Sequence, residues 1–87
     1  MSVEYWKRRL AKRGLALTVY DMEPTRDWTC FVEPIDRSRS DVRFRPLIGI
    51  AIHRFRDEAI RNAVADFEFA EAEQLREKVA LALAGGA

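Results

Sequence analysis

Apolar residues near the start of the chain recur at i, i+3 and i+7, the spacing of one helix face. They are Val3, Trp6 and Leu10. Ser2 precedes them and can cap the helix with its hydroxyl, and Gly14 supplies a left-handed stop. The pattern predicts a helix over residues 2–13.

Three later segments alternate apolar with polar residues, which is the period of a β-strand. The first two, near 15–22 and 28–33, flank turn residues and predict a hairpin. The third, near 47–55, holds isoleucines at alternate positions, and their β-branched side chains favour a strand over a helix. We expect this strand to enter the core through Ile48, Ile50 and Ile52.

Helical spacing returns in the last third of the chain and predicts a helix over 57–84. Two apolar stripes, one ending at Phe67 and one beginning at Phe69, do not line up, because residues two apart point about 200° from each other around a helix. A straight helix must expose one ring or bury both faces. The alternative is a break at 66–68, where Asp66 is an acceptable cap for a second helix.

The order helix, strand, strand, strand, helix predicts one α+β domain over residues 1–87, with a three-stranded antiparallel sheet covered by helices. Eighty-seven residues leave no room for a second core. The expected core consists of Trp6, Leu10, Leu17, Val19, Cys30, Val32, Ile48, Ile50, Ile52, Ile60, Val64 and Phe67.

Composition is that of an ordinary globular domain, with 48% hydrophobic and 33% charged residues. The net charge of +1 gives no overall attraction to nucleic acid or to an anionic membrane. A single cysteine excludes an internal disulfide and favours a reducing, cytoplasmic location. The apolar runs are far shorter than the roughly 18–20 residues that cross a bilayer, so we expect no membrane contact.

Few residues are candidates for chemistry. His53 is the only histidine and Cys30 the only cysteine, and the sequence nominates no nucleophile or carboxylate to act with either. A structural role is the interpretation that we favour for both. Spacings typical of zinc sites, calcium loops and phosphate-binding loops are missing from the sequence, so we expect no metal, no cofactor and no enzyme activity.

Arginine and aromatic residues, the types favoured at interface centres, are densest in the Arg37–Arg45 segment and in the triplet Arg54-Phe55-Arg56. The contact with a protein or nucleoprotein partner is therefore predicted at Arg37, Arg39, Arg43, Arg45, Arg54, Phe55 and Arg56. Apolar residues beyond those needed to cover the sheet predict a self-association face, and with it a homodimer, at Phe69, Leu75, Val79 and Leu83. The sequence thus favours a non-catalytic binder, either an adaptor or an inhibitor.

The competing hypothesis is nucleic-acid binding by the basic side of the first helix and by two strand arginines. A phosphate backbone would be held by Lys7, Arg8, Lys12, Arg43 and Arg45. The last helix would repel nucleic acid unless it points away, because residues 56–84 carry seven acidic residues against four basic ones.

Residues 60–79 resemble the UVR motif of nucleotide-excision-repair proteins, a short helical hairpin used for protein–protein contact. Ile60 and Ala63 match its first helix, and its second helix is matched by Phe69, Ala72, Leu75, Arg76 and Val79. The chain departs from the motif at Glu73, where the family usually has alanine, and at Phe67-Glu68, where it has a Leu-Asp pair. The resemblance covers under a quarter of the chain and implies a protein-interaction role.

The element order also resembles the double-stranded-RNA-binding fold, but Arg56-Asp57-Glu58 stands where that fold places its lysine-rich helix start. In size, mixed charge and lack of catalytic residues the chain is similar to small phage-encoded α+β proteins, including anti-CRISPR inhibitors. That similarity is one of type, without a shared motif, and implies inhibition by covering part of a larger complex.

Overall fold

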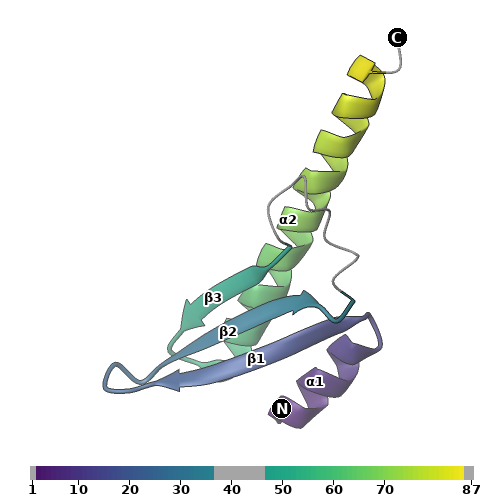
Figure 1. Ribbon diagram of the computed structural model, residues 1–87. Helices are drawn as coiled ribbons and strands as arrows, with labels where there is room; N and C mark the ends of the chain where they lie inside the picture. Colours follow the sequence, from purple (N-terminus) through teal and green to yellow (C-terminus); the bar gives the residue numbers. More distant parts are fainter. Residues whose placement is uncertain (1, 37–46, 86–87) are drawn as a thin grey trace.

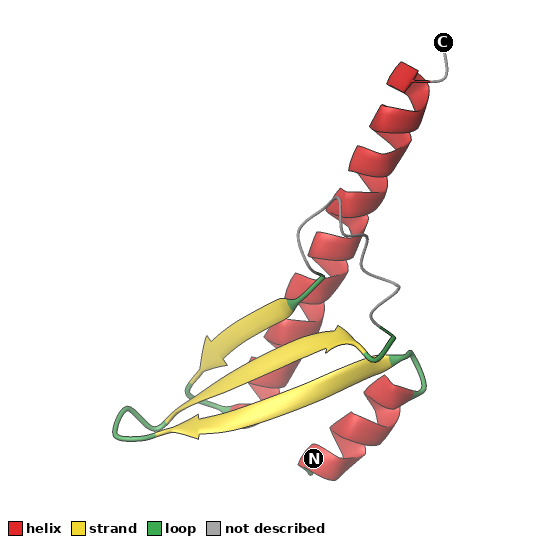
Figure 2. Cartoon of the chain, in the orientation of Figure 1, coloured by secondary structure: helices red, strands yellow, loops and turns green. Residues whose placement is uncertain are grey.

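The computed structural model describes residues 2–36 and 47–85, which form a small α+β fold in the predicted order. The three strands make one antiparallel sheet in the order β1-β2-β3, and both helices pack against the same face of it (Figures 1 and 2). The elements are α1 (Val3–Ala11), β1 (Leu15–Met22), β2 (Asp27–Pro34), β3 (Gly49–His53) and α2 (Arg56–Gly85).

The first helix begins and ends as its sequence predicts. The Ser2 hydroxyl accepts a hydrogen bond from the Tyr5 amide at 3.1 Å, which satisfies one amide of the first turn. Gly14 turns the chain into β1 with φ at 72°, a left-handed conformation that glycine adopts without steric strain. Trp6 and Leu10, one turn apart on α1, are buried against the rest of the fold.

The core lies between the sheet and the two helices. Seven of the predicted core residues are buried there: Trp6, Leu10, Leu17, Cys30, Val32, Ile60 and Phe67. Val19 and Val64 pack at its edge and are half-buried. Four further core residues were not predicted: Leu15, Leu47, Ala59 and Ala63.

The prediction of which face of β3 enters the core was wrong. Ile50 and Ile52 are exposed, and Ile48 is only half-buried. Gly49 and Ala51 face α2 instead, and α2 lies so close that a methyl group on Gly49 would overlap the carbonyl oxygen of Ala63. Because only small side chains fit between this strand and the helix, the isoleucines point to the opposite face.

Helix α2 runs without a break through residues 66–68, so it exposes one of its two phenylalanine rings. Phe67 is fully buried, and Phe69 is 66% exposed. Asp66 caps no second helix; its carboxylate accepts a hydrogen bond from the Ile50 amide at 2.9 Å, which satisfies an outward-facing group of the edge strand. Residues 60–79 therefore form a single helix and not the hairpin that the UVR resemblance implies.

Candidate functional site

In the part of the chain that the structure describes, one face of the sheet has no helix over it, and we call it the open face. Its members alternate with the core residues along the strands. Asp27 and Glu33 lie at its two ends on β2, and the members between them are uncharged: Ala16, Thr18, Tyr20, Met22, Thr29, Phe31, Ile50 and Ile52. Figure 1 shows α2 passing behind the sheet, on the other side. Four members are exposed and keep 45–63% of their accessible surface: Ile50, Met22, Tyr20 and Ile52. A contiguous apolar surface of this kind is typical of an interaction site.

Cross-strand contacts hold the open face in a fixed shape. The rings of Tyr20 and Phe31 meet edge to face, with centroids 5.7 Å apart and planes at 82°. Thr29 lies in register between Tyr20 and Ile52 and is only 8% exposed, because these larger neighbours shelter it. A surface that is ordered before a partner arrives loses little conformational entropy on binding.

The triplet Arg54-Phe55-Arg56 lies where β3 ends, next to the open-face residue Ile52. Phe55 is 63% exposed, its amide donates to His53 Nδ1 at 2.9 Å, and the two rings lie 5.7 Å apart. The guanidinium of Arg56 lies 5.9 Å from the centroid of the Trp28 ring, and Arg54 is exposed. Arg56 is half-buried and pairs with Asp57 at 3.7 Å, so the triplet presents one exposed ring and one exposed cation, Phe55 and Arg54.

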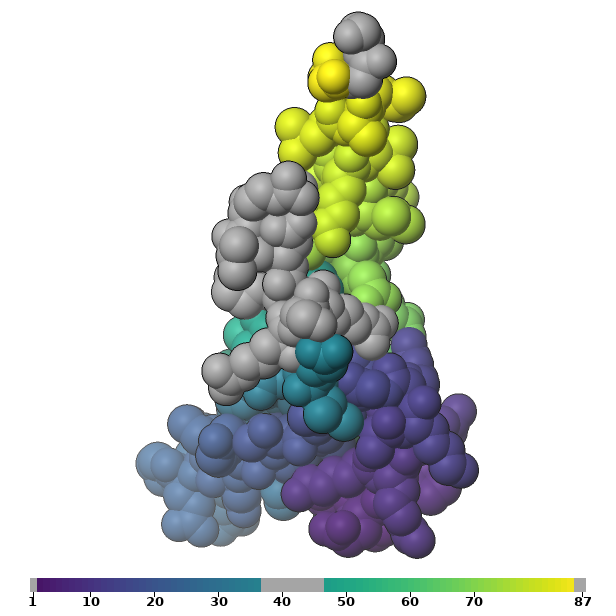
Figure 3. Space-filling model, turned by 45° about the vertical axis from the view of Figure 1, so that its right-hand side comes forward, coloured from purple at the N-terminus to yellow at the C-terminus, as the bar shows by residue number. Residues whose placement is uncertain are grey.

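The second half of α2 projects beyond the sheet (Figure 3). The predicted self-association residues are all exposed there: Phe69, Leu75, Val79 and Leu83. Together with the exposed Ala72 and Ala82 they form a stripe on the side of the helix away from the sheet, which we call the outer stripe. Leu81 is also exposed, but its position around the helix axis continues the side that carries Phe67.

Helix α1 keeps three of its basic side chains in solvent: Lys7, Arg8 and Lys12. Its other basic neighbours are engaged within the fold. Arg9 donates to the Tyr5 hydroxyl at 3.2 Å, and Arg13 pairs with Glu68 of α2 at 2.9 Å. The predicted basic surface is therefore exposed on α1, but it is smaller than the five cations of residues 7–13 suggest.

The contacts of His53 and Cys30 are those of residues with a structural role. Because His53 Nδ1 accepts the Phe55 amide, a neutral ring carries its proton on Nε2. Cys30 is fully buried, and burial raises the pKa of its thiol, which opposes formation of the reactive thiolate. Within residues 2–36 and 47–85, no group of three or more histidine, cysteine or acidic side chains is placed to hold a metal ion. This geometry prepares neither a nucleophile nor a general base.

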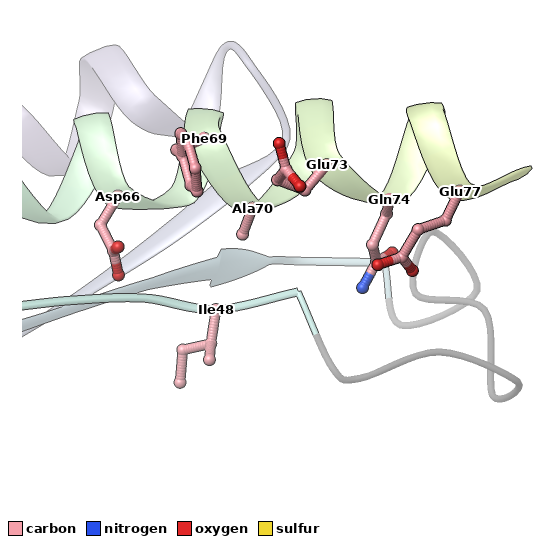
Figure 4. Close-up of a pocket in the computed structure, with 7 residues that line it drawn as sticks. All are labelled: Ile48, Asp66, Phe69, Ala70, Glu73, Gln74 and Glu77. Carbon is pink, nitrogen blue, oxygen red and sulfur yellow. The ribbon is translucent and has the colours of Figure 1, made fainter.

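A cleft of about 460 Å³ lies between α2 and the residue that leads into β3, Ile48 (Figure 4). Asp66, Gln74 and Glu77 extend from α2 toward the strand side in this view. Asp66 is already engaged by the Ile50 amide, and Glu73 pairs with Arg76 at 2.7 Å. Two of its three acidic residues are engaged in this way, and its described lining residues include no nucleophile, histidine or basic side chain to act with Glu77.

Part of the predicted partner contact lies outside the described residues: Arg37, Arg39, Arg43 and Arg45. The strands lead toward that segment at the end of the sheet opposite the triplet, since Val32 faces Gly49 there and Trp28 faces His53 at the other end. The open face itself was not predicted. Its signal in the sequence was the pair of small residues, Gly49 and Ala51, which mark the strand face that a helix approaches closely.

Comparison with known proteins finds no relative of this chain. No family model matches it, and no curated protein or solved structure matches it. Among the described residues, no helix has both the length and the apolar content to cross a bilayer. The function must therefore be argued from the surfaces themselves.

Proposed function

We propose that this protein is a non-catalytic protein-binding module, an adaptor or an inhibitor, that docks on a larger protein or nucleoprotein complex. The docking surface is the open face with the adjoining triplet Arg54-Phe55-Arg56. The observation that carries the proposal is the open face itself: a preordered sheet surface, uncharged between Asp27 and Glu33, that no helix of the described residues covers. A sheet surface of this kind is stabilised when a second apolar layer covers it.

The chemistry of the surface defines the partner that it fits. Tyr20, Phe31 and the isoleucines favour an apolar helix or strand surface laid across the sheet. Arg54, which is exposed at one end, favours a carboxylate on that partner, because guanidinium groups bind carboxylates bidentately. Arg56 is half-buried and already pairs with Asp57 at 3.7 Å. Phe55 provides an exposed ring of the type that dominates binding energy at interfaces.

A module of this size acts by covering a surface of its partner, since it brings no chemistry of its own. This mode of action agrees with the similarity of type to small phage-encoded inhibitors. The buried free thiol of Cys30 suits a reducing compartment, so we place the protein in the cytoplasm.

Affinity capture from the source organism tests the docking surface. Ile52→Glu places a charge in the open face, and Phe55→Ala removes the exposed ring. Both side chains are 63% exposed, so we expect both variants to keep the wild-type melting transition and to lose the captured partner. Leu81→Glu is the matched control, because Leu81 is 60% exposed and lies on α2, away from this surface.

The expected pattern is one partner retained by wild type and Leu81→Glu and lost by the other two variants. If Ile52→Glu captures the same partner at wild-type yield, the open face is not the docking site. If wild type captures no protein at all, the protein-binding proposal fails.

The exposed cations of α1 support nucleic-acid binding as a second candidate function. Binding through Lys7, Arg8 and Lys12 must weaken steeply with added salt, because each neutralised phosphate releases counterions. Anisotropy titrations on duplex RNA, duplex DNA and single strands, repeated at several salt concentrations, measure how steeply the affinity falls. An affinity that falls with salt for wild type and vanishes in the triple glutamate variant supports this function, and no binding at low salt dismisses it.

A further inference from the structure

The outer stripe has the geometry of a helix-pairing surface. Ala72 and Val79 are seven residues apart, and Leu75 and Ala82 repeat the same interval three residues later, which are the spacings of the a and d positions of a coiled coil. The larger side chains of Phe69 and Leu83 flank this seam. Small residues along the seam allow a second helix to approach closely.

In the part of the chain that the structure describes, this stripe is exposed. Arg13, which follows α1, pairs with Glu68 of α2, and the stripe begins at the next residue. From Val79 to Gly85 the helix carries no charge on any side, although the large side chains of this segment are exposed. A helix end that is apolar all round and packs on nothing is only marginally stable in water, so a covering element is expected.

We propose that the outer stripe pairs with the same stripe of a second copy of this chain, in an antiparallel helix dimer whose two-fold axis passes near Glu77. In this register Leu75 packs against the partner's Val79, and Ala72 packs against the partner's Ala82. The stripe and the open face share no residue, so this proposal is independent of the proposed function.

The helix dipoles favour the antiparallel arrangement, because they oppose each other in it. The first half of the paired region carries Glu71 and Glu73, whereas residues 79–85 are uncharged. An antiparallel pair therefore sets these carboxylates beside the uncharged segment of the other copy.

The size of the contact predicts how tightly the dimer forms. Residues 69–85 overlap over about 24 Å of helix length and about 10 Å of width. This footprint of about 240 Å² on each copy is below the roughly 800 Å² per partner of standard stable interfaces, so the dimer should be weak and concentration-dependent. The dimer would carry two open faces, and a bivalent module gains avidity for a partner that presents two sites.

Sedimentation equilibrium between about 5 µM and about 500 µM tests the pairing, because weak interfaces of this size dissociate across that range. We expect the mass of wild type to rise from the 10.1 kDa of one chain toward twice that value. Val79→Glu should stay at one chain throughout. Leu81→Glu is the control, since Leu81 is similarly exposed on the other side of the helix, and it should dimerise as wild type does. One-chain mass for wild type at every concentration, or equal masses for the two variants, overturns the proposal.

Disulfide cross-linking tests the orientation. The native Cys30 should not cross-link, because it is buried. The test uses two variants, Ala72→Cys and Ala82→Cys. Cysteine is close in size to alanine, and both positions lie on the seam. A disulfide needs Cα atoms within about 7 Å of each other. The antiparallel register brings position 72 beside the partner's position 82, and it separates identical positions by about 15 Å along the axis. We therefore expect the mixed sample to cross-link and each variant alone not to. Cross-linking of each variant alone would show a parallel pair and contradict the proposal.

Discussion

The two faces of the sheet are built from the same strands, but one packs against the helices and the other is exposed. Along β3, Gly49 and Ala51 face α2, while the much larger Ile50 and Ile52 face outward and stay exposed. The small residues are the structural ones here, because they let the helix backbone approach the strand. Small side chains on a strand face therefore indicate that the covering layer lies close. Large apolar side chains on a strand face do not by themselves indicate burial.

This division separates folding from binding. The covered face holds the buried cluster that joins the sheet to both helices, so changes there should act on stability. The open face adds little to the core and is available to a partner, so changes there should act on binding. Substitutions at neighbouring positions on opposite faces can break or sharpen this contrast.

The largest contrast is between Val32→Asp and Ile50→Asp. Val32 is fully buried, and an unpaired carboxylate there should cost at least about 3 kcal/mol, a large part of the stability of a small domain. Ile50 is 45% exposed, and a carboxylate there stays hydrated, so the loss should be within about 1 kcal/mol. Thermal melts followed by circular dichroism measure both. Equal losses would mean that Ile50 belongs to the core, as the strand pattern first predicted.

The two rings of α2 give the next contrast. Phe67→Ala empties a fully buried site and should lower the free energy of unfolding by about 3–5 kcal/mol. Phe69→Ala changes an exposed ring and should lie within about 0.5 kcal/mol of wild type. Urea unfolding compares them, at a protein concentration where the chain is monomeric. A larger loss for Phe69→Ala would show that the helix is rotated from the orientation described here.

Two glycines test the close contact between β3 and α2. In Gly49→Ala the new methyl group would lie 2.6 Å from the Phe67 amide nitrogen, so the helix must shift, at a cost of about 1–3 kcal/mol. Gly85→Ala meets no atom within 4 Å and should leave the melting temperature unchanged or slightly raised. Scanning calorimetry on both variants measures the difference. A Gly49→Ala protein as stable as wild type would rule out this close approach.

The smallest expected effect concerns the hydrogen bond between Asp66 and the Ile50 amide. Asp66→Ala removes the acceptor and should cost about 1 kcal/mol, a typical value for one hydrogen bond. Hydrogen exchange at the Ile50 amide should become faster in this variant. Asp66→Asn keeps an acceptor oxygen and should restore most of the protection. Unchanged exchange in Asp66→Ala would show that the bond does not form in solution.

Most of the fold was predictable because local rules fixed it. The Ser2 cap and the Gly14 stop set the ends of the first helix, and strand periodicity located all three strands within a few residues. The face of β3 was not predictable from hydrophobicity, because both of its faces are apolar. The deciding factor was the distance between strand and helix, which is a tertiary property.

The candidate site was predictable only in part. The four residues of the predicted self-association face are exposed, as their excess over the needs of the core suggested: Phe69, Leu75, Val79 and Leu83. Phe55, predicted from the density of arginine and aromatic residues, is exposed too. The open face was missed because its isoleucines had been assigned to the core. The role of Asp66 was missed for a similar reason, since a helical carboxylate that accepts a strand amide leaves no local pattern in the sequence.

The most direct test of a protein-binding open face is site-specific photo-cross-linking in the source organism. A photoreactive amino acid replaces Ile52 on the open face in one variant and Arg8 on α1 in the other, both at exposed positions. We expect a discrete cross-linked protein at position 52, identifiable by mass spectrometry, and no such product at position 8. The same product at both positions, or no discrete product at position 52, would contradict docking through the open face.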